Sequence, residues 1–203
     1  MRASHVVAIG LRAKTGRAIA VVLGGSADSP SVITKLEISL VDPKLPSTFQ
    51  PYHEVMELPW DESQRAVRKY VRAIEKVAAK NLAVLVKKLK GQGLTVKGVG
   101  VVGAADRDLS RIGNYHIRAH AAEGVLFRSV LEFGADQNEL RRRTFADRSF
   151  AASAQAELGK KHSSVTQMID DLRRSVAPPW RADEKLAAMA AWLVLHQLQN
   201  RER

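Results

Sequence analysis

Hydrophobic positions in the first forty residues follow the pattern of three consecutive strands. Residues 5–11 and 17–24 are apolar runs joined by a short polar turn that ends at Gly16. Residues 31–40 alternate apolar and polar side chains, which is typical of a strand with one solvated face. Four of the seven prolines then fall within residues 41–59, so we expect an irregular connection there.

The spacing of apolar residues next changes to three and four, which predicts a long amphipathic helix. We expect Asp61 and Gln64 to form its N-terminal cap, and Gly91 and Gly93 to end it. The apolar stripe of this helix comprises Val67, Val71, Ile74, Ala78, Leu82, Leu85 and Leu89.

Two more strands and several helices are expected in the second half. Residues 96–102 are almost free of charge, as in a central strand covered on both faces, and 139–146 is the best candidate for a fifth strand. Asn114 is expected to cap a helix that runs to about Phe133. Further helical patterns occupy residues 149–158, 163–175 with Ser163 or Ser164 as the cap, and 183–200, with a stop at Pro178–Pro179.

Three glycines in the fourth strand have the spacing of a dinucleotide-binding loop. Gly98, Gly100 and Gly103 lie inside the strand, however, whereas the nucleotide motif belongs to the turn after a strand. We therefore expect these glycines to let a helix pack closely on the sheet.

Composition suits one globular domain that spans residues 1–203, with 45% hydrophobic residues. The chain has no cysteine, which excludes disulfides, thiolate catalysis and cysteine-bound zinc. No apolar run reaches the roughly 18 residues of a membrane span, and no secretory leader pattern is found at the N-terminus. We expect no membrane contact, and a cytoplasmic location by default.

The charge balance points to a polyanionic partner. The net charge is +11 and the isoelectric point is about 10.2. Such a field concentrates polyanions near the surface, and nucleic acid is the commonest of them.

The order of elements, three strands followed by helix, strand, helix, strand and helix, is that of a ribonuclease-H-like fold. Within it, three segments resemble RuvC-type Holliday-junction resolvases: 113–126 (GNYHIRAHAAEGVL), 159–169 (GKKHSSVTQMI) and 181–190 (RADEKLAAMA). The resemblance implies an α/β fold with a mixed five-stranded sheet, whose first three strands are antiparallel, and helices on both faces.

The same resemblance implies four acidic positions that hold two metal ions in this family. The first falls within residues 10–12 and the second within 99–103, and neither stretch contains a carboxylate. On the last helix Glu184 matches one position, Arg181 stands at the other, and Asp183 lies one residue off. Paired hard cations need mainly carboxylate ligands. We therefore expect no metal cofactor and no catalytic residue in the family's sense.

A displaced acidic cluster is the alternative. Asp106 and Asp108 follow the fourth strand, and together with Asp183 and Glu184 they would supply ligands to Mg or Mn. The simpler interpretation is that the two loop aspartates are solvated and that Asp183 caps the last helix.

A second candidate metal site lies on the helix after Asn114. His116, His120 and Glu123 share one face at positions i, i+4 and i+7 and would present three ligands to one ion. The glutamate that zinc hydrolases carry next to the first histidine is missing, and the same spacing is frequent on solvated helices.

Basic residues follow one face of the first helix, opposite its apolar stripe, where they would track a phosphate backbone. They are Arg65, Arg68, Lys69, Arg72, Lys76 and Lys80. Further expected phosphate contacts are Arg107, Arg111, Lys160 and Lys161, the last two at a helix start, and residues 141–143 form another basic cluster. Aromatic residues make up only 5% of the chain, so duplex or branched DNA is favoured over stacked single strands.

The sequence thus favours a catalytically degenerate RuvC-like domain that binds nucleic acid or serves as a scaffold. One alternative is a metal-dependent, structure-specific endonuclease with displaced acids. The other is a structural interaction domain, which would form a homodimer or bind an acidic protein through its basic surface.

Overall fold

Five strands form one mixed sheet in the order β3-β2-β1-β4-β5, in a computed structural model that describes residues 5–201. The first three strands pair antiparallel, and β4 and β5 run parallel to β1. Their bounds are β1 (His5–Lys14), β2 (Arg17–Ser26), β3 (Ser29–Ser39), β4 (Leu94–Gly103) and β5 (Arg141–Ala146). This sheet confirms the predicted topology.

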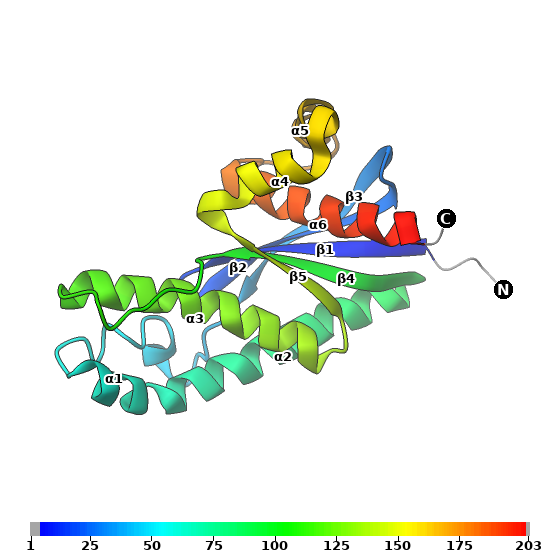
Figure 1. The fold of residues 1–203 in the computed structure, drawn as a ribbon. Coiled ribbons are helices and arrows are strands. Elements are labelled where there is room, and N and C mark those ends of the chain that lie inside the picture. The colour runs from blue at the N-terminus through cyan, green and yellow to red at the C-terminus, as the bar shows by residue number, and fades with distance from the viewer. Residues whose placement is uncertain (1–4, 202–203) are drawn as a thin grey trace.

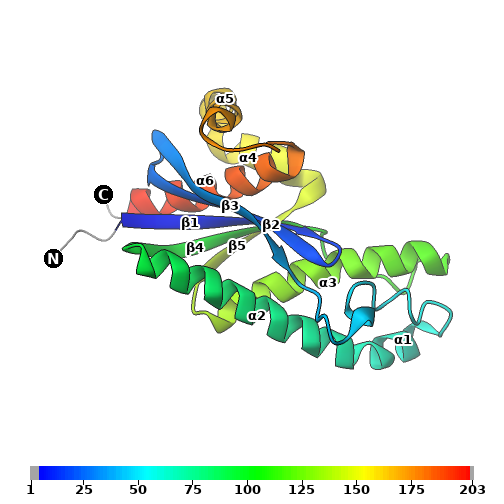
Figure 2. The ribbon, with the colours of Figure 1, turned by 180° about the vertical axis from the view of Figure 1, so that it is seen from behind.

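Helices cover both faces of the sheet, which is the arrangement predicted (Figures 1 and 2). One face carries α2 (Arg68–Gly91) and α3 (Tyr115–Gln137), and α1 (Trp60–Ala66) precedes α2 along the chain. The other carries α4 (Phe150–Leu158), α5 (His162–Asp171) and α6 (Ala182–Arg201). Short 3-10 turns lie at Pro46–Thr48, Asp147–Ser149, Gly159–Lys161 and Leu172–Ser175.

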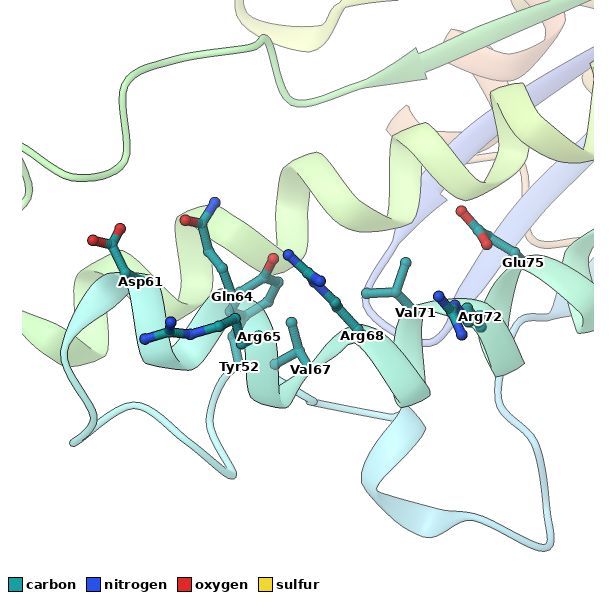
Figure 3. A pocket seen from close by; sticks show the side chains of 9 residues that line it. All are labelled: Tyr52, Asp61, Gln64, Arg65, Val67, Arg68, Val71, Arg72 and Glu75. Carbon is teal, nitrogen blue, oxygen red and sulfur yellow. The ribbon is translucent and has the colours of Figure 1, made fainter.

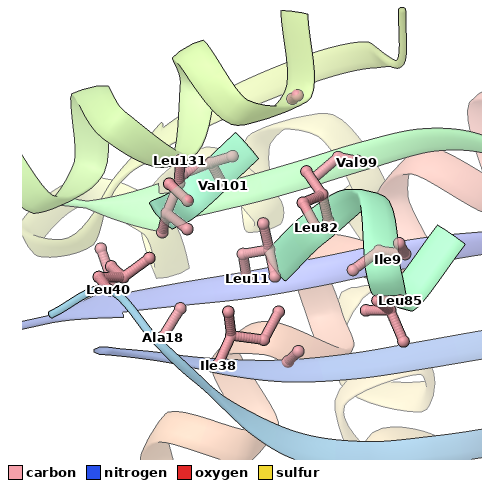
Figure 4. Packing of buried hydrophobic residues seen from close by; sticks show 14 of the residues in the cluster. Ile9, Leu11, Ala18, Ile38, Leu40, Leu82, Leu85, Val99, Val101 and Leu131 are labelled. Carbon is pink, nitrogen blue, oxygen red and sulfur yellow. The ribbon is translucent and has the colours of Figure 1, made fainter. Parts of the chain in front are cut away.

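The two helical layers bury separate hydrophobic cores because side chains alternate across each strand. Ile9 and Leu11 of β1 point toward α2 and α3, where they meet Leu82 and Leu131 (Figure 4). The opposite core is made by α4, α5 and α6. Within this second core residues 187–195 of α6 are all buried, which matches the uninterrupted apolar run AAMAAWLVL.

Helix α6 lies in direct backbone contact with the sheet at two glycines. A Cβ atom added at Gly10 would lie 1.7 Å from the carbonyl oxygen of Ala187, and one at Gly100 would lie 2.6 Å from that of Ala190. At Gly98 a Cβ would meet the side chain of Val194 at 2.7 Å. The prediction that the glycines of β4 admit a closely packed helix is therefore confirmed for Gly98 and Gly100.

Several predicted helix ends differ from the structure. The first helix begins at Trp60, after Pro59, and is interrupted at Val67. Asp61 therefore lies inside the first turn and is not the cap, although its charge still suits the positive end of the helix dipole.

The cap at Asn114 is confirmed, since its Oδ1 accepts a hydrogen bond of 2.9 Å from the backbone N–H of Ile117. The expected serine cap of α5 is wrong, because the helix already begins at His162. Ser164 instead donates a hydrogen bond of 2.8 Å to the carbonyl oxygen of Lys161. None of the helices within residues 5–201 has the length and apolar character needed to cross a membrane.

Candidate functional site

Two cations of β1 lie against two carboxylates at the end of the strand remote from the termini. Nε of Arg12 is 3.3 Å from Oδ1 of Asp183, and its Nη2 is 3.3 Å from Oδ2 of Asp147. Nζ of Lys14 is 3.1 Å from Oδ2 of Asp183. We call these four residues the Arg12 corner.

Strand alternation explains how the Arg12 corner forms. Gly10 and Arg12 face α6, whereas Leu11 between them is buried in the opposite core. Asp147 comes from the 3-10 turn after β5, and Asp183 from the first turn of α6. The side chain of Arg12 is only 14% exposed, so its charge is compensated by these carboxylates more than by water.

The carboxyl group of Asp183 titrates below its usual range. Burial on its own would raise the pKa, but the hydrogen bond and positive charge of Lys14, followed by those of Arg12, outweigh burial and lower the pKa of Asp183. The carboxylate therefore stays ionised and paired.

The residues at this corner do not fit a pair of divalent metal ions. A carboxylate at position 10 would have no room beside Ala187, and position 12 carries a cation. Glu184, the one acid that matches the family pattern, is 7% exposed, and its Oε2 accepts the backbone N–H of Arg181 at 2.8 Å. That contact holds the start of α6 together.

The two loop aspartates do not join Asp183 and Glu184. Asp106 pairs with Arg128 at 2.5 Å, and Asp108 lies 3.0 Å from Nε of Arg111. In the part of the chain that the structure describes, no group of three acidic residues brings its ligating atoms within 4.8 Å of one another. The displaced acidic cluster is therefore not assembled.

The structure does bring together three histidines. Nε2 of His116 and Nε2 of His120 lie 2.9 Å apart on α3, and His53 joins them from the connection between β3 and α1. Ligating atoms of the three rings all lie within 4.8 Å of one another. We call this group the histidine cluster.

The expected ligand set of this helix needs one correction. Oε1 of Glu123 lies 2.8 Å from Nδ1 of His53 and also accepts the backbone N–H of His53 at 3.3 Å. Glu123 is therefore the partner of a histidine and stands outside the group of three. Sequence reasoning missed His53 because it lies in an irregular segment whose residues carry no periodic signal.

The predicted basic stripe is fully presented to solvent. All six of its residues are exposed, and none of them forms an ion pair with a described carboxylate. Arg65, Arg68 and Arg72 line a groove of about 670 Å³ along α1 and α2, with Asp61 and Glu75 also on its lining (Figure 3).

The other predicted phosphate contacts differ in whether their charge is free or paired with a carboxylate. Arg107 is exposed and lines a hollow of about 370 Å³ together with Arg148 and His120. Lys160 and Lys161 are exposed in the 3-10 turn that precedes α5. Arg111, by contrast, pairs with Asp108.

The basic cluster at residues 141–143 is largely neutralised. Arg142 lies 2.8 Å from Asp136, and Arg143 lies 2.7 Å from Glu157. The hydrogen bond from Arg142 to Asp136 raises the pKa of the guanidinium further above its usual value. These arginines connect β5 to neighbouring helices and offer little free charge.

Comparison with known proteins finds similarity at the level of structure. No protein-family model matches the chain, and no curated protein matches its sequence. The structure of Thermus thermophilus RuvC in complex with a Holliday junction substrate aligns with a TM-score of 0.51 and 11% identity, over 98% of this chain and 96% of that one. A second Thermus thermophilus RuvC structure aligns with a TM-score of 0.48 and 12% identity, over 97% and 96%. At such identity the likeness defines the architecture alone: the chain has the ribonuclease-H-like fold of RuvC type.

Proposed function

We propose that this chain is a catalytically degenerate RuvC-like domain that binds duplex or branched DNA. The observation that carries the proposal is the Arg12 corner, where two side-chain cations pair with the carboxylates at the end of β1. A guanidinium and an ammonium neutralise these acids, so the corner offers little negative charge to divalent metal ions.

The basic stripe supports the binding part of the proposal. From Arg65 to Lys80 the helical rise amounts to about 22 Å, enough to follow roughly six base pairs of a phosphate backbone. Its six exposed cations lack carboxylate partners among residues 5–201, so their charge is available to phosphates. The RuvC chain with the same fold was solved with a Holliday junction substrate.

Fluorescence anisotropy with labelled four-way junctions and linear duplexes tests binding directly. We expect affinity to fall steeply with salt, with a log–log slope of about −5 if all six stripe residues contact phosphates. The triple variant Arg65→Glu, Arg72→Glu and Lys76→Glu should abolish most of this binding.

A matched triple variant controls for the loss of net charge alone. Lys44→Glu, Lys97→Glu and Arg173→Glu remove the same charge from three exposed and separated positions. This control should retain most of the affinity at fixed salt. Equal losses in both triples would contradict the stripe as the contact surface, and a flat salt response would favour the interaction domain that binds an acidic protein.

The proposed absence of nuclease activity is tested by incubating branched and linear DNA with the protein in Mg²⁺ or Mn²⁺. We expect no cleavage above background. Metal-dependent cutting that disappears in Glu184→Ala would overturn this part of the proposal and establish a metal-dependent endonuclease.

A further inference from the structure

We infer that the histidine cluster, made of His53, His116 and His120, is a binding site for one divalent transition-metal ion of the zinc class. Three imidazoles from two separate segments converge there with their ligating atoms within 4.8 Å. The site is distinct from the Arg12 corner and rests on neither DNA binding nor catalysis.

The backbone positions all three rings for a common ligand. His116 and His120 lie one turn apart at the start of α3, which Asn114 caps, so both rings point from one face of the helix. The connection before α1 then places His53 with its ring centroid 5.2 Å from that of His116 and 4.4 Å from that of His120. Ligands of a tetrahedral zinc ion with N–Zn bonds near 2.0–2.1 Å lie about 3.4 Å apart, so small rotations of these side chains would complete the site.

Two buried polar atoms have no partner without such an ion. Nε2 of His53 and Oε2 of Glu123 are both buried and form no hydrogen bond. Glu123 is 1% exposed, and burial of a carboxylate oxygen that has no hydrogen-bond partner is costly. A metal ion bound to Nε2 of His53 would give this nitrogen a partner, and its positive charge would compensate the carboxylate of Glu123.

Glu123 has the position of an orienting residue in a metal site. Its Oε1 holds Nδ1 of His53 at 2.8 Å, which leaves Nε2 as the ring nitrogen without a partner. Metal-binding histidines usually donate their other ring N–H to a carboxylate, a backbone carbonyl or water, and this contact fixes the ring and makes it a better ligand.

The donor set selects the kind of ion. Three neutral imidazoles suit zinc, cobalt, nickel or copper, whereas Mg²⁺ and Ca²⁺ prefer carboxylates and carbonyls. His116 and His120 are exposed, so the fourth coordination position would be filled by water. The bound ion would also link the irregular connection between β3 and α1, which carries His53, to helix α3.

Visible absorbance of the chelator-treated full chain titrated with Co²⁺ tests the site, followed by displacement with Zn²⁺. We expect tetrahedral cobalt bands at one ion per chain, and a rise in melting temperature with Zn²⁺. His116→Gln and His120→Gln change exposed residues of a stable helix and should each weaken Co²⁺ affinity by more than about 100-fold, beyond the 10–100-fold expected for Glu123→Gln.

His162→Gln is the matched control, because His162 is a half-buried histidine of α5 outside the cluster. It should leave cobalt binding unchanged. Absence of the tetrahedral bands and of a Zn²⁺-dependent melting shift in the unmodified chain would overturn the inference. Full retention of binding in His53→Gln would also overturn it, since only the two exposed helical histidines would then hold the ion.

Discussion

Nε of Arg12 lies 3.3 Å from Oδ1 of Asp183, a contact that spans 171 positions of the sequence. It joins the end of β1 to the first turn of α6, and the same guanidinium also reaches Asp147 after β5. A single side chain thus connects three elements at the edge where the resemblance places metal ligands.

Replacing Arg12 with alanine should destabilise the fold. Asp147 would lose its ion pair with Arg12 and Asp183 would keep only Lys14, so we expect a loss of about 1–3 kcal/mol in the free energy of unfolding. Urea denaturation measures it. Arg17→Ala is the control, because Arg17 and Glu37 form an exposed pair whose loss should change stability by less than about 1 kcal/mol. Equal effects of the two substitutions would show that the Arg12 corner has no special structural role.

Asp183 should make stability depend on acid pH. Its pKa is lowered in the folded state, because the contacts with Lys14 and Arg12 outweigh the effect of burial. The contribution of this carboxylate is therefore complete above its unfolded pKa of about 3.9 and is lost as the pH falls through the lower folded value. Melting temperatures between pH 2 and pH 6, compared with those of Asp183→Asn, measure it. The two curves should converge at the acid end, and parallel curves would contradict the role of Asp183.

The contact between α6 and the sheet predicts severe effects from very small substitutions. Gly10→Ala would drive a methyl group into the carbonyl oxygen of Ala187, and Gly100→Ala into that of Ala190. We expect each to reduce the free energy of unfolding by at least about 3 kcal/mol, because backbone cannot move aside as a flexible side chain can.

Gly113→Ala provides the control for these glycine substitutions, since no atom lies within 4 Å of the added Cβ atom. It should leave the unfolding midpoint nearly unchanged. A mild effect of Gly10→Ala would mean that α6 can shift away from the sheet, and that the close contact is not a fixed feature of the fold.

The sequence predicted the elements well because each has its own periodic signal. The alternation in β3, the uncharged run of β4 and the cap at Asn114 are local patterns, and the glycines of β4 indicated a closely packed helix. Helix starts were less accurate, since a proline at position 59 and a residue such as His162 can begin a helix without a side-chain cap.

The candidate sites were harder to predict because they depend on pairings between distant segments. Periodicity placed His116 and His120 on one face but gave no sign of His53. The resemblance placed an acid of the family within residues 10–12, where this chain has none, yet it did not reveal that Asp147 and Asp183 would pair with Arg12. The sequence showed a basic cluster at residues 141–143. It did not show that Asp136 and Glu157 would neutralise two of these arginines.

The backbone of α6 resting on Gly10 and Gly100 bears on the evolutionary history open to such a domain. An acidic side chain at either position would place its Cβ atom against a carbonyl oxygen of the helix, so α6 would first have to be displaced by other mutations. These two strand positions are therefore closed to any side chain larger than the hydrogen of glycine, and sequence change in such a domain is directed to its outer surface.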